Sequence, residues 1–332
     1  MIIKPMLESS SASTIDTYTA ASCPDTVSFL SKSESNPILC SGTYTLHEDG
    51  STQTHTGQLI TFTISQSLQL VSTGSLNLDY GIFDLVYPPC SNFHIFYTAN
   101  TNGTISCFNL NSETNLLSLQ SNTTVAHDSM ITSIIPTDQN VYSTSSSGKV
   151  FQTDSATQIT TVQGQHSFDA WCCHYHSGSK TLLSGGDDAL IRRWDPRVPS
   201  QVGCFKHHSA GVISLYVEEE GKEHEVLSGG YDDYIHKWDL RFPRRVLIEK
   251  KLSGGVWDIV EVDSKYFLCS CMYGGVSLID KSSFEVISEY KGHDSIVYGA
   301  DYWSRGTEVY YVSCSFYDNG IHMWKASNEN GI

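Results

Sequence analysis

The stretch Ser184-Gly-Gly-Asp-Asp-Ala-Leu-Ile-Arg-Arg-Trp-Asp195 is repeated 44 residues later as Ser228-Gly-Gly-Tyr-Asp-Asp-Tyr-Ile-His-Lys-Trp-Asp239. A period of about 40 to 45 residues that ends in Trp-Asp is typical of a β-propeller with four-stranded blades. Each copy predicts a strand of small residues, a turn, and a second strand that ends at the tryptophan. These two segments therefore predict an all-β fold.

Weaker copies of the repeat continue the period in both directions. The turn positions are 56, 102, 147, 188, 232, 273 and 318, with gaps of 46, 45, 41, 44, 41 and 45 residues. In the sixth copy Tyr273 replaces the turn aspartate and Ile279 replaces the tryptophan, whereas Asp318 and Trp324 keep both in the seventh. The sequence therefore predicts seven blades.

Each period also contains a short apolar segment that we expect to form the innermost strand of its blade. These segments are 27–30, 81–86, 130–135, 170–175, 211–216, 255–260 and 296–301. Four of them follow a histidine at a fixed offset, namely His127, His166, His208 and His293. In WD repeats this histidine, a strand serine, the turn aspartate and the tryptophan form a buried hydrogen-bonded chain. The expected sets are His166/Ser184/Asp188/Trp194 and His208/Ser228/Asp232/Trp238.

Only eight residues follow Trp324, too few for the seventh blade to form its own outermost strand. We expect residues 15–19 to supply that strand, because closing the ring removes two open sheet edges. The expected domain is a single seven-bladed WD40 β-propeller over residues 13–325, closed by this N-terminal strand. Residues 1–12 and 326–332 are expected to be flexible.

The composition restricts the partners and the compartment. A net charge of −16 argues against nucleic acid, because phosphate binding needs a basic stripe. The acidity either favours a basic or cationic partner or serves only solubility. The sequence has neither a run of about eighteen apolar residues nor the layout of a signal peptide, so we expect no membrane insertion. The ten cysteines are expected to be reduced, most of them within strands. A cytoplasmic monomer is the expectation.

Common catalytic motifs are missing from the sequence. The nearest approach to a Gly-x-Ser-x-Gly elbow is His207-His-Ser-Ala-Gly211, which has histidine in place of the first glycine. There is no phosphate loop, no His-Glu-x-x-His and no Cys-x-x-Cys. Cys269-Ser-Cys271 has no second pair, so neither a metal site nor a cofactor is expected. Motifs alone favour a non-catalytic scaffold.

Several segments depart from generic WD repeats. They are His166-Ser-Phe-Asp-Ala-Trp171, Gly254-Gly-Val-Trp-Asp-Ile259, Val297-Tyr-Gly-Ala-Asp-Tyr302, Cys314-Ser-Phe-Tyr-Asp318, Cys40-Ser-Gly-Thr-Tyr44 and the Trp-Asp-x-Arg endings at Arg197 and Arg241. Together they resemble the diphthine methyl esterase family, the WD-repeat proteins of the diphthamide pathway once called diphthine methyltransferases. The resemblance covers most of the chain and is strongest over residues 166–324. Asp169 departs from it, since glutamate is expected there, and the loop before Cys314 is short.

The resemblance implies hydrolysis of a methyl ester on the modified histidine of translation elongation factor 2, which gives diphthine and methanol. That factor would be the protein partner. The modified residue carries a quaternary ammonium group, which aromatic faces and carboxylates attract. Near the channel mouth we expect this substrate-binding set: Trp171, Trp257, Asp258, Tyr298 and Asp301. The alternative role is structural, with the aromatic side chains packed between blades and the aspartates capping turns.

Ester hydrolysis also needs a proton acceptor. Without a serine elbow, we expect water activated by a histidine. His207 is one candidate base, because His208 takes the repeat position; His166 oriented by Asp169 is another, although His166 also fits the structural chain. Ser209 is either a direct nucleophile or a turn residue. The alternative function is a non-catalytic WD-repeat scaffold for trafficking or complex assembly, whose aromatic and acidic mouth holds a peptide.

Overall fold

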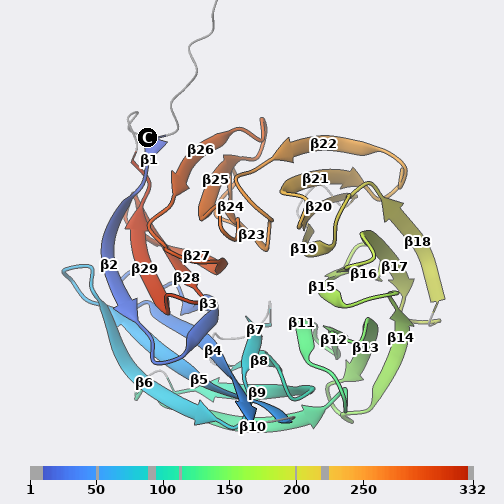
Figure 1. Ribbon diagram of the computed structural model, residues 1–332, viewed down its shortest axis with the longest axis horizontal. Helices are drawn as coiled ribbons and strands as arrows, with labels where there is room; N and C mark the ends of the chain where they lie inside the picture. The colour runs from blue at the N-terminus through green and yellow to red at the C-terminus, as the bar shows by residue number, and fades with distance from the viewer. Residues whose placement is uncertain are drawn as a thin grey trace, which may run out of the picture.

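The computed structural model describes residues 10–49, 52–88, 95–111, 114–198, 200–217 and 224–327. Within these ranges every regular element is a β strand, and the strands form seven sheets around a central axis (Figure 1). The predicted seven-bladed, all-β propeller is confirmed. Of the two ends expected to be flexible, residues 1–9 and 328–332 lie outside the described ranges.

The first five blades each consist of four consecutive antiparallel strands that run from the channel outward. Blade one has β3 (Cys23–Ser31), β4 (Ile38–Asp49), β5 (Thr52–Ile64) and β6 (Leu70–Leu78), and blade two has β7 (Ile82–Val86), β8 (Ile95–Asn100), β9 (Thr104–Leu110) and β10 (Leu117–Thr124). Blade three has β11 (Ile131–Pro136), β12 (Asn140–Ser145), β13 (Lys149–Asp154) and β14 (Thr160–Gln165). Blade four has β15 (Ala170–His176), β16 (Thr181–Gly186), β17 (Leu190–Asp195) and β18 (Ser200–Lys206), and blade five has β19 (Val212–Val217), β20 (Glu225–Gly230), β21 (Tyr234–Asp239) and β22 (Val246–Lys251).

The last two blades take strands from the N-terminal part of the chain. Blade six has β23 (Asp258–Glu261), β24 (Tyr266–Ser270), β25 (Val276–Asp280) and β26 (Val286–Tyr290), and blade seven has β27 (Val297–Arg305), β28 (Glu308–Ser315) and β29 (Gly320–Lys325). As predicted, β2 (Ser13–Thr19) pairs antiparallel with β29 and completes blade seven (Figure 1). In addition, β1 (Ser10–Ser11) pairs parallel with β26, a contact the sequence did not predict.

Blades seven and one pack together to close the ring. Phe29 and Phe62 of blade one share a buried cluster with Trp303 and Met323 of blade seven, and all four are nearly inaccessible to solvent. The Trp303 indole also donates a 3.0 Å hydrogen bond to the Ser33 carbonyl. Each large apolar side chain buried in this way contributes about 1.5–3 kcal/mol to stability.

Both predicted hydrogen-bonded sets are present. In blade four the His166 ring lies 2.8 Å from Asp188 and 2.7 Å from Ser184, whose hydroxyl accepts a 2.8 Å bond from the Trp194 indole. The set of His208, Ser228, Asp232 and Trp238 repeats this pattern in blade five. Blade seven has a looser copy, since His293 Nδ1 lies 3.8 Å from the Asp318 carboxylate. His127, at the same offset in blade three, is exposed.

The innermost strand of blade six begins three residues later than predicted, at Asp258. A side chain at Gly254 would come within 2.3 Å of the Cys271 carbonyl, and one at Gly255 within 2.7 Å of the Met272 sulfur. This close backbone packing holds the segment before β23 in a loop, so Trp257 lies at the strand entrance.

All nine cysteines in the described ranges are free thiols, as predicted for them. Over the same part of the chain, the structure has no helix with the length and apolarity needed to cross a membrane.

Candidate functional site

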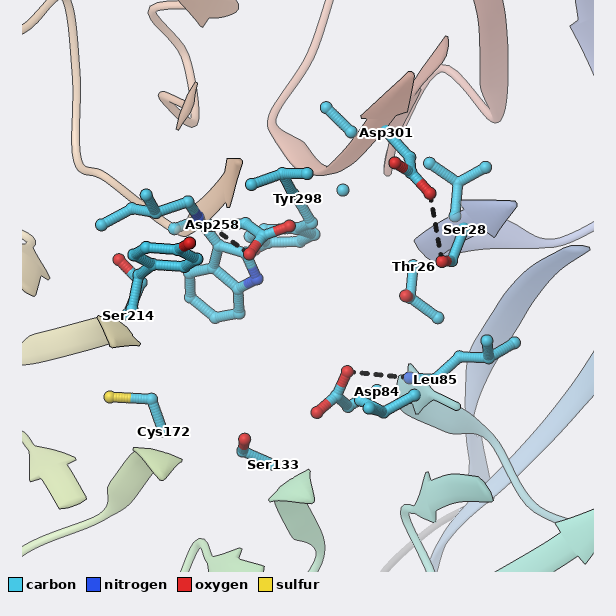
Figure 2. A pocket seen from close by; sticks show the side chains of 18 of the residues that line it. Thr26, Ser28, Asp84, Leu85, Ser133, Cys172, Ser214, Asp258, Tyr298 and Asp301 are labelled. Carbon is cyan, nitrogen blue, oxygen red and sulfur yellow. Dashed lines mark hydrogen bonds between the residues drawn. The ribbon is translucent and has the colours of Figure 1, made fainter. Parts of the chain in front are cut away.

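A central pocket with a volume of about 490 Å³ lies within the ring of innermost strands. Its lining comes from all seven blades, so it forms only when the ring is closed. Figure 2 shows side chains from β3, β7, β11, β15, β19, β23 and β27 converging on this space. The lining includes several aromatic side chains and four aspartates, Asp25, Asp84, Asp258 and Asp301.

Four aromatic side chains form what we call the aromatic layer: Phe83, Trp171, Trp257 and Tyr298. The Trp257 ring centre lies 4.5 Å from that of Tyr298, 5.9 Å from Trp171 and 6.1 Å from Phe83. Trp171 is fixed by a 2.7 Å hydrogen bond from its indole to Asp187. These rings pack against one another and line one pocket. Aromatic faces in such a lining attract an organic cation.

Asp301 holds blade seven to blade one. Its Oδ2 accepts a 2.8 Å hydrogen bond from the backbone of Phe29 and a 3.2 Å bond from Ser28, which is drawn in Figure 2. Its Oδ1 lies 2.7 Å from the Lys32 ammonium and accepts a bond from the backbone of Tyr302. The Asp301 carboxylate lines the pocket, but its oxygens already accept hydrogen bonds that hold blade seven against blade one.

Asp84 makes a similar connection between blades two and three. Its carboxylate accepts hydrogen bonds from the backbone of Leu85 at 2.8 Å and of Ile134 at 3.1 Å. Burial raises the pKa of Asp84 to about 6, although these bonds favour its charged form.

Asp258 lies at the equivalent position in blade six, but it has a single hydrogen bond among the described residues. The backbone of Ile259 donates that bond at 2.8 Å. Burial, and then the negative charge of Asp84, raise the pKa of Asp258 to about 7. A carboxyl group with this pKa can accept and return a proton near neutral pH.

Asp25 is the most isolated of the four carboxyl groups. The residue is 2% exposed, and neither carboxyl oxygen has a hydrogen-bond partner within the described ranges. Burial raises the pKa of Asp25 well above its usual value, and the charge of Asp84 adds to this effect. The protonated acid, which can donate a hydrogen bond into the pocket, is therefore favoured.

The structure brings all five residues predicted to bind substrate into one pocket: Trp171, Trp257, Asp258, Tyr298 and Asp301. The three predicted catalytic residues, His207, His166 and Asp169, are not part of its lining. The pairing of His166 with Asp169 was wrong, because Asp188 and Ser184 occupy both ring nitrogens of His166. The Asp169 backbone carbonyl instead accepts a bond from Asp187.

His207 lies in the connection between β18 of blade four and β19 of blade five, where its Nε2 is 2.6 Å from the Glu249 carboxylate of blade five. Its side chain is 46% exposed. The backbone N–H of the nearby Ser209 donates a 2.9 Å hydrogen bond to Asp232, and the residue lies in the turn before β19. Of the two roles predicted for Ser209, nucleophile or turn residue, this position fits the turn residue.

Sequence reasoning missed Asp25 and Asp84. The signal for Asp84 was present, because Phe83-Asp84 repeats the aromatic-aspartate pair Trp257-Asp258 in the same part of the innermost strand. Asp25 was overlooked because the strand was predicted to begin at residue 27, whereas β3 begins at Cys23.

Comparisons with known proteins agree with this architecture. The family described as "WD domain, G-beta repeat" matches residues 156–195. The protein named diphthine methyltransferase from Schizosaccharomyces pombe is 28% identical over 175 residues, 48% of this chain and 52% of that protein. Its human namesake is 28% identical over 150 residues, 42% of this chain and 33% of the human protein. The Saccharomyces cerevisiae protein of the same name is 37% identical over 89 residues, which are 22% of this chain and 22% of that protein. The matches thus span about half of the fission yeast protein's length and a third of the human one's.

The seven blades, the two hydrogen-bonded sets and the repeat match define a WD-repeat β-propeller with a central aromatic and acidic pocket. The relatives matched in fission yeast, human and mouse are each named diphthine methyltransferase, and this chain is similar to them over part of its length. This agrees with the resemblance found in the sequence motifs.

Proposed function

We propose that the protein acts in diphthamide biosynthesis and hydrolyses the methyl ester of methylated diphthine on translation elongation factor 2. The products are diphthine and methanol. The observation that carries this proposal is the combination, in one pocket, of the aromatic layer with buried carboxyl groups. The name of the relatives, diphthine methyltransferase, supports the pathway, while ester hydrolysis is our inference.

A quaternary ammonium group has no N–H to donate, so it is recognised by aromatic faces and by nearby negative charge. The aromatic layer supplies the faces, and the carboxylates of Asp84 and Asp301 line the same pocket. The net charge of −16 also favours approach of a cationic side chain. We infer that Trp257 and Tyr298, whose rings are the closest pair in the layer at 4.5 Å, contact the trimethylammonium group.

Asp258 and Asp25 can supply the acid-base chemistry. Ionised Asp258 removes a proton from water as the water oxygen attacks the ester carbonyl carbon. Protonated Asp25 donates a hydrogen bond to the oxyanion that forms. When the C–OCH₃ bond breaks, the proton held by Asp258 passes to the departing methoxide, which leaves as methanol. Positioned general bases of this kind accelerate reactions by about 10²–10⁴-fold.

These roles compete with the histidine base predicted from the sequence, and the two hypotheses are separable by mutation. Purified protein is incubated with elongation factor 2 that carries methylated diphthine, and mass spectrometry follows the loss of one methylene mass and the release of methanol. Turnover at catalytic amounts of protein is the expected result. We expect Asp258→Asn to lower kcat by about 10²-fold or more, while His207→Ala, outside the pocket, keeps the wild-type rate.

An unchanged mass with stable binding of the factor would refute the esterase and leave the scaffold function. Loss of activity in His207→Ala, with full activity in Asp258→Asn, would restore the histidine mechanism. The matched charge control is Asp128→Asn, because Asp128 is an exposed carboxylate outside the pocket lining.

A further inference from the structure

Blade five carries a group of three side chains suited to metal binding, outside the central pocket. His207 follows β18, His236 lies on β21 and Glu249 lies on β22, and their ligand atoms are all within 4.8 Å of one another. His236 and Glu249 are direct partners in the β21–β22 register. We propose that these three residues form a site for a divalent transition-metal ion, specifically Zn²⁺.

The distances need only small adjustment to fit this ion. Glu249 Oε2 lies 2.6 Å from His207 Nε2 and 3.2 Å from His236 Nε2. Zinc bonds of about 2.0–2.2 Å in tetrahedral geometry place neighbouring ligand atoms about 3.3 Å apart. The His236–Glu249 distance already matches. The His207–Glu249 distance must open by less than about 1 Å, and both of those side chains are nearly half exposed and free to move by this amount.

The third ligand, His236, is buried and its Nε2 is directed at the site. Its Nδ1 lies 3.1 Å from His208 Nε2, which also lies 2.7 Å from the Ser228 hydroxyl. Its Nε2 faces Glu249 Oε2 at 3.2 Å. A metal ion between these two atoms would replace the proton that joins them, because a ligating histidine nitrogen must be unprotonated.

His208 also acts as the outer partner that metal-binding histidines usually have. Such a partner fixes the tautomer and the ring orientation of the ligand, and its loss typically weakens metal binding 10- to 100-fold. The His236 side chain is 2% exposed, so the surrounding side chains fix the position of its ring. The structural set of blade five therefore orients one ligand of the site.

Equivalent positions in other blades lack this combination. Blade four has Arg192 opposite Cys204 at the corresponding register position, and blade seven has His322 opposite Thr17. Arg192 donates to Asp188 within its own blade. The repeat alone thus does not require histidine and glutamate here. Two histidines and one carboxylate suit zinc, and the exposed face leaves a fourth position for water.

The test measures metal binding directly on the full chain after treatment with a chelator. Zinc is titrated against a chromophoric competitor, and Co²⁺ is then used as a spectroscopic probe. We expect one equivalent of zinc, and a visible Co²⁺ ligand-field band without the thiolate charge-transfer band that cysteine ligands would give. His207→Ala and Glu249→Gln should each weaken binding by about tenfold or more.

His127→Ala is the matched control, because this histidine is exposed and lies before β11 of blade three, outside the proposed site; it should bind zinc as the wild type does. Thermal melting of each variant without metal checks that it is folded. Absence of zinc binding in the wild type would overturn the proposal. A zinc affinity of His207→Ala and Glu249→Gln equal to that of the wild type would also overturn it. Because the readout is binding, failure of the esterase proposal would leave this result unaffected.

Discussion

Replacing Asp258 by asparagine is expected to stabilise the protein at neutral pH while removing its proposed catalytic base. In the folded protein the pKa of Asp258 is raised to about 7 from an ordinary value of 3.8. Between these two pH values the folded state binds more protons at this site than the unfolded state, so stability falls as the pH rises. A difference of about three pKa units corresponds to at most about 4 kcal/mol. Asparagine keeps the acceptor for the Ile259 bond and has no charge to bury.

The assay is urea unfolding of the wild type and Asp258→Asn at pH values from about 4 to 8. The difference in unfolding free energy should be close to zero near pH 4, increase through pH 5–7 and level off above the folded pKa, with the variant more stable by up to about 4 kcal/mol. Asp128→Asn removes an exposed charge and should show no such rise. A constant difference across the pH range, or a variant less stable than wild type at pH 8, would refute the account of Asp258 as a buried, unpaired carboxyl group.

Three further predictions concern the ring and its pocket. Ser228→Ala should destabilise the protein by about 2–4 kcal/mol in urea, because it leaves the Trp238 indole and the His208 ring buried without their shared partner; an unchanged midpoint would contradict the structural role of this set. Deletion of residues 1–19 should lower the melting temperature of the whole domain in a single transition, since it removes β2 and exposes the edge of β29; a melting temperature equal to that of the full chain would disprove closure by β2. Trp257→Leu should raise KM for the methylated factor by about 2- to 30-fold, the loss of a cation–π contact of about 0.5–2 kcal/mol, while a change in kcat alone would argue against cation binding by this ring.

Sequence periodicity was sufficient to predict the architecture. The Trp-Asp ending and the regular turn positions predicted the number of blades, and the count of residues after Trp324 predicted that an N-terminal strand must complete the last one. Both features reflect a repeat in which each blade has the same local pattern. The parallel pairing of β1 with β26 was not predictable, because a strand of two residues has no periodicity.

The site was predictable only in part. Aromatic residues at the starts of innermost strands converge because seven equivalent positions meet at one axis, so Trp171, Trp257 and Tyr298 could be grouped from sequence. The hydrogen-bonded sets of the repeat were also predicted correctly, and the same contacts exclude the catalytic pairing of His166 with Asp169. These two residues are three apart in sequence, yet the His166 ring bonds Asp188. The Asp25 carboxyl group gave no sequence signal, because isolation from partners is a property of the folded pocket.

The aspartates of the pocket separate structural from functional carboxyl groups by their partners. Asp84 and Asp301 accept backbone N–H groups from the next blade, Ile134 and Phe29, and therefore stabilise the contacts between blades. Asp258 accepts a bond only from its own strand among the described residues. Its burial raises the free energy of its ionised form without a matching gain in packing. Buried carboxyl groups whose charged form has few hydrogen bonds to stabilise it are typical of sites that use that charge, either for a cationic ligand or for a proton. For this reason Asp258, rather than Asp84 or Asp301, is the carboxylate whose removal should cost activity while improving stability.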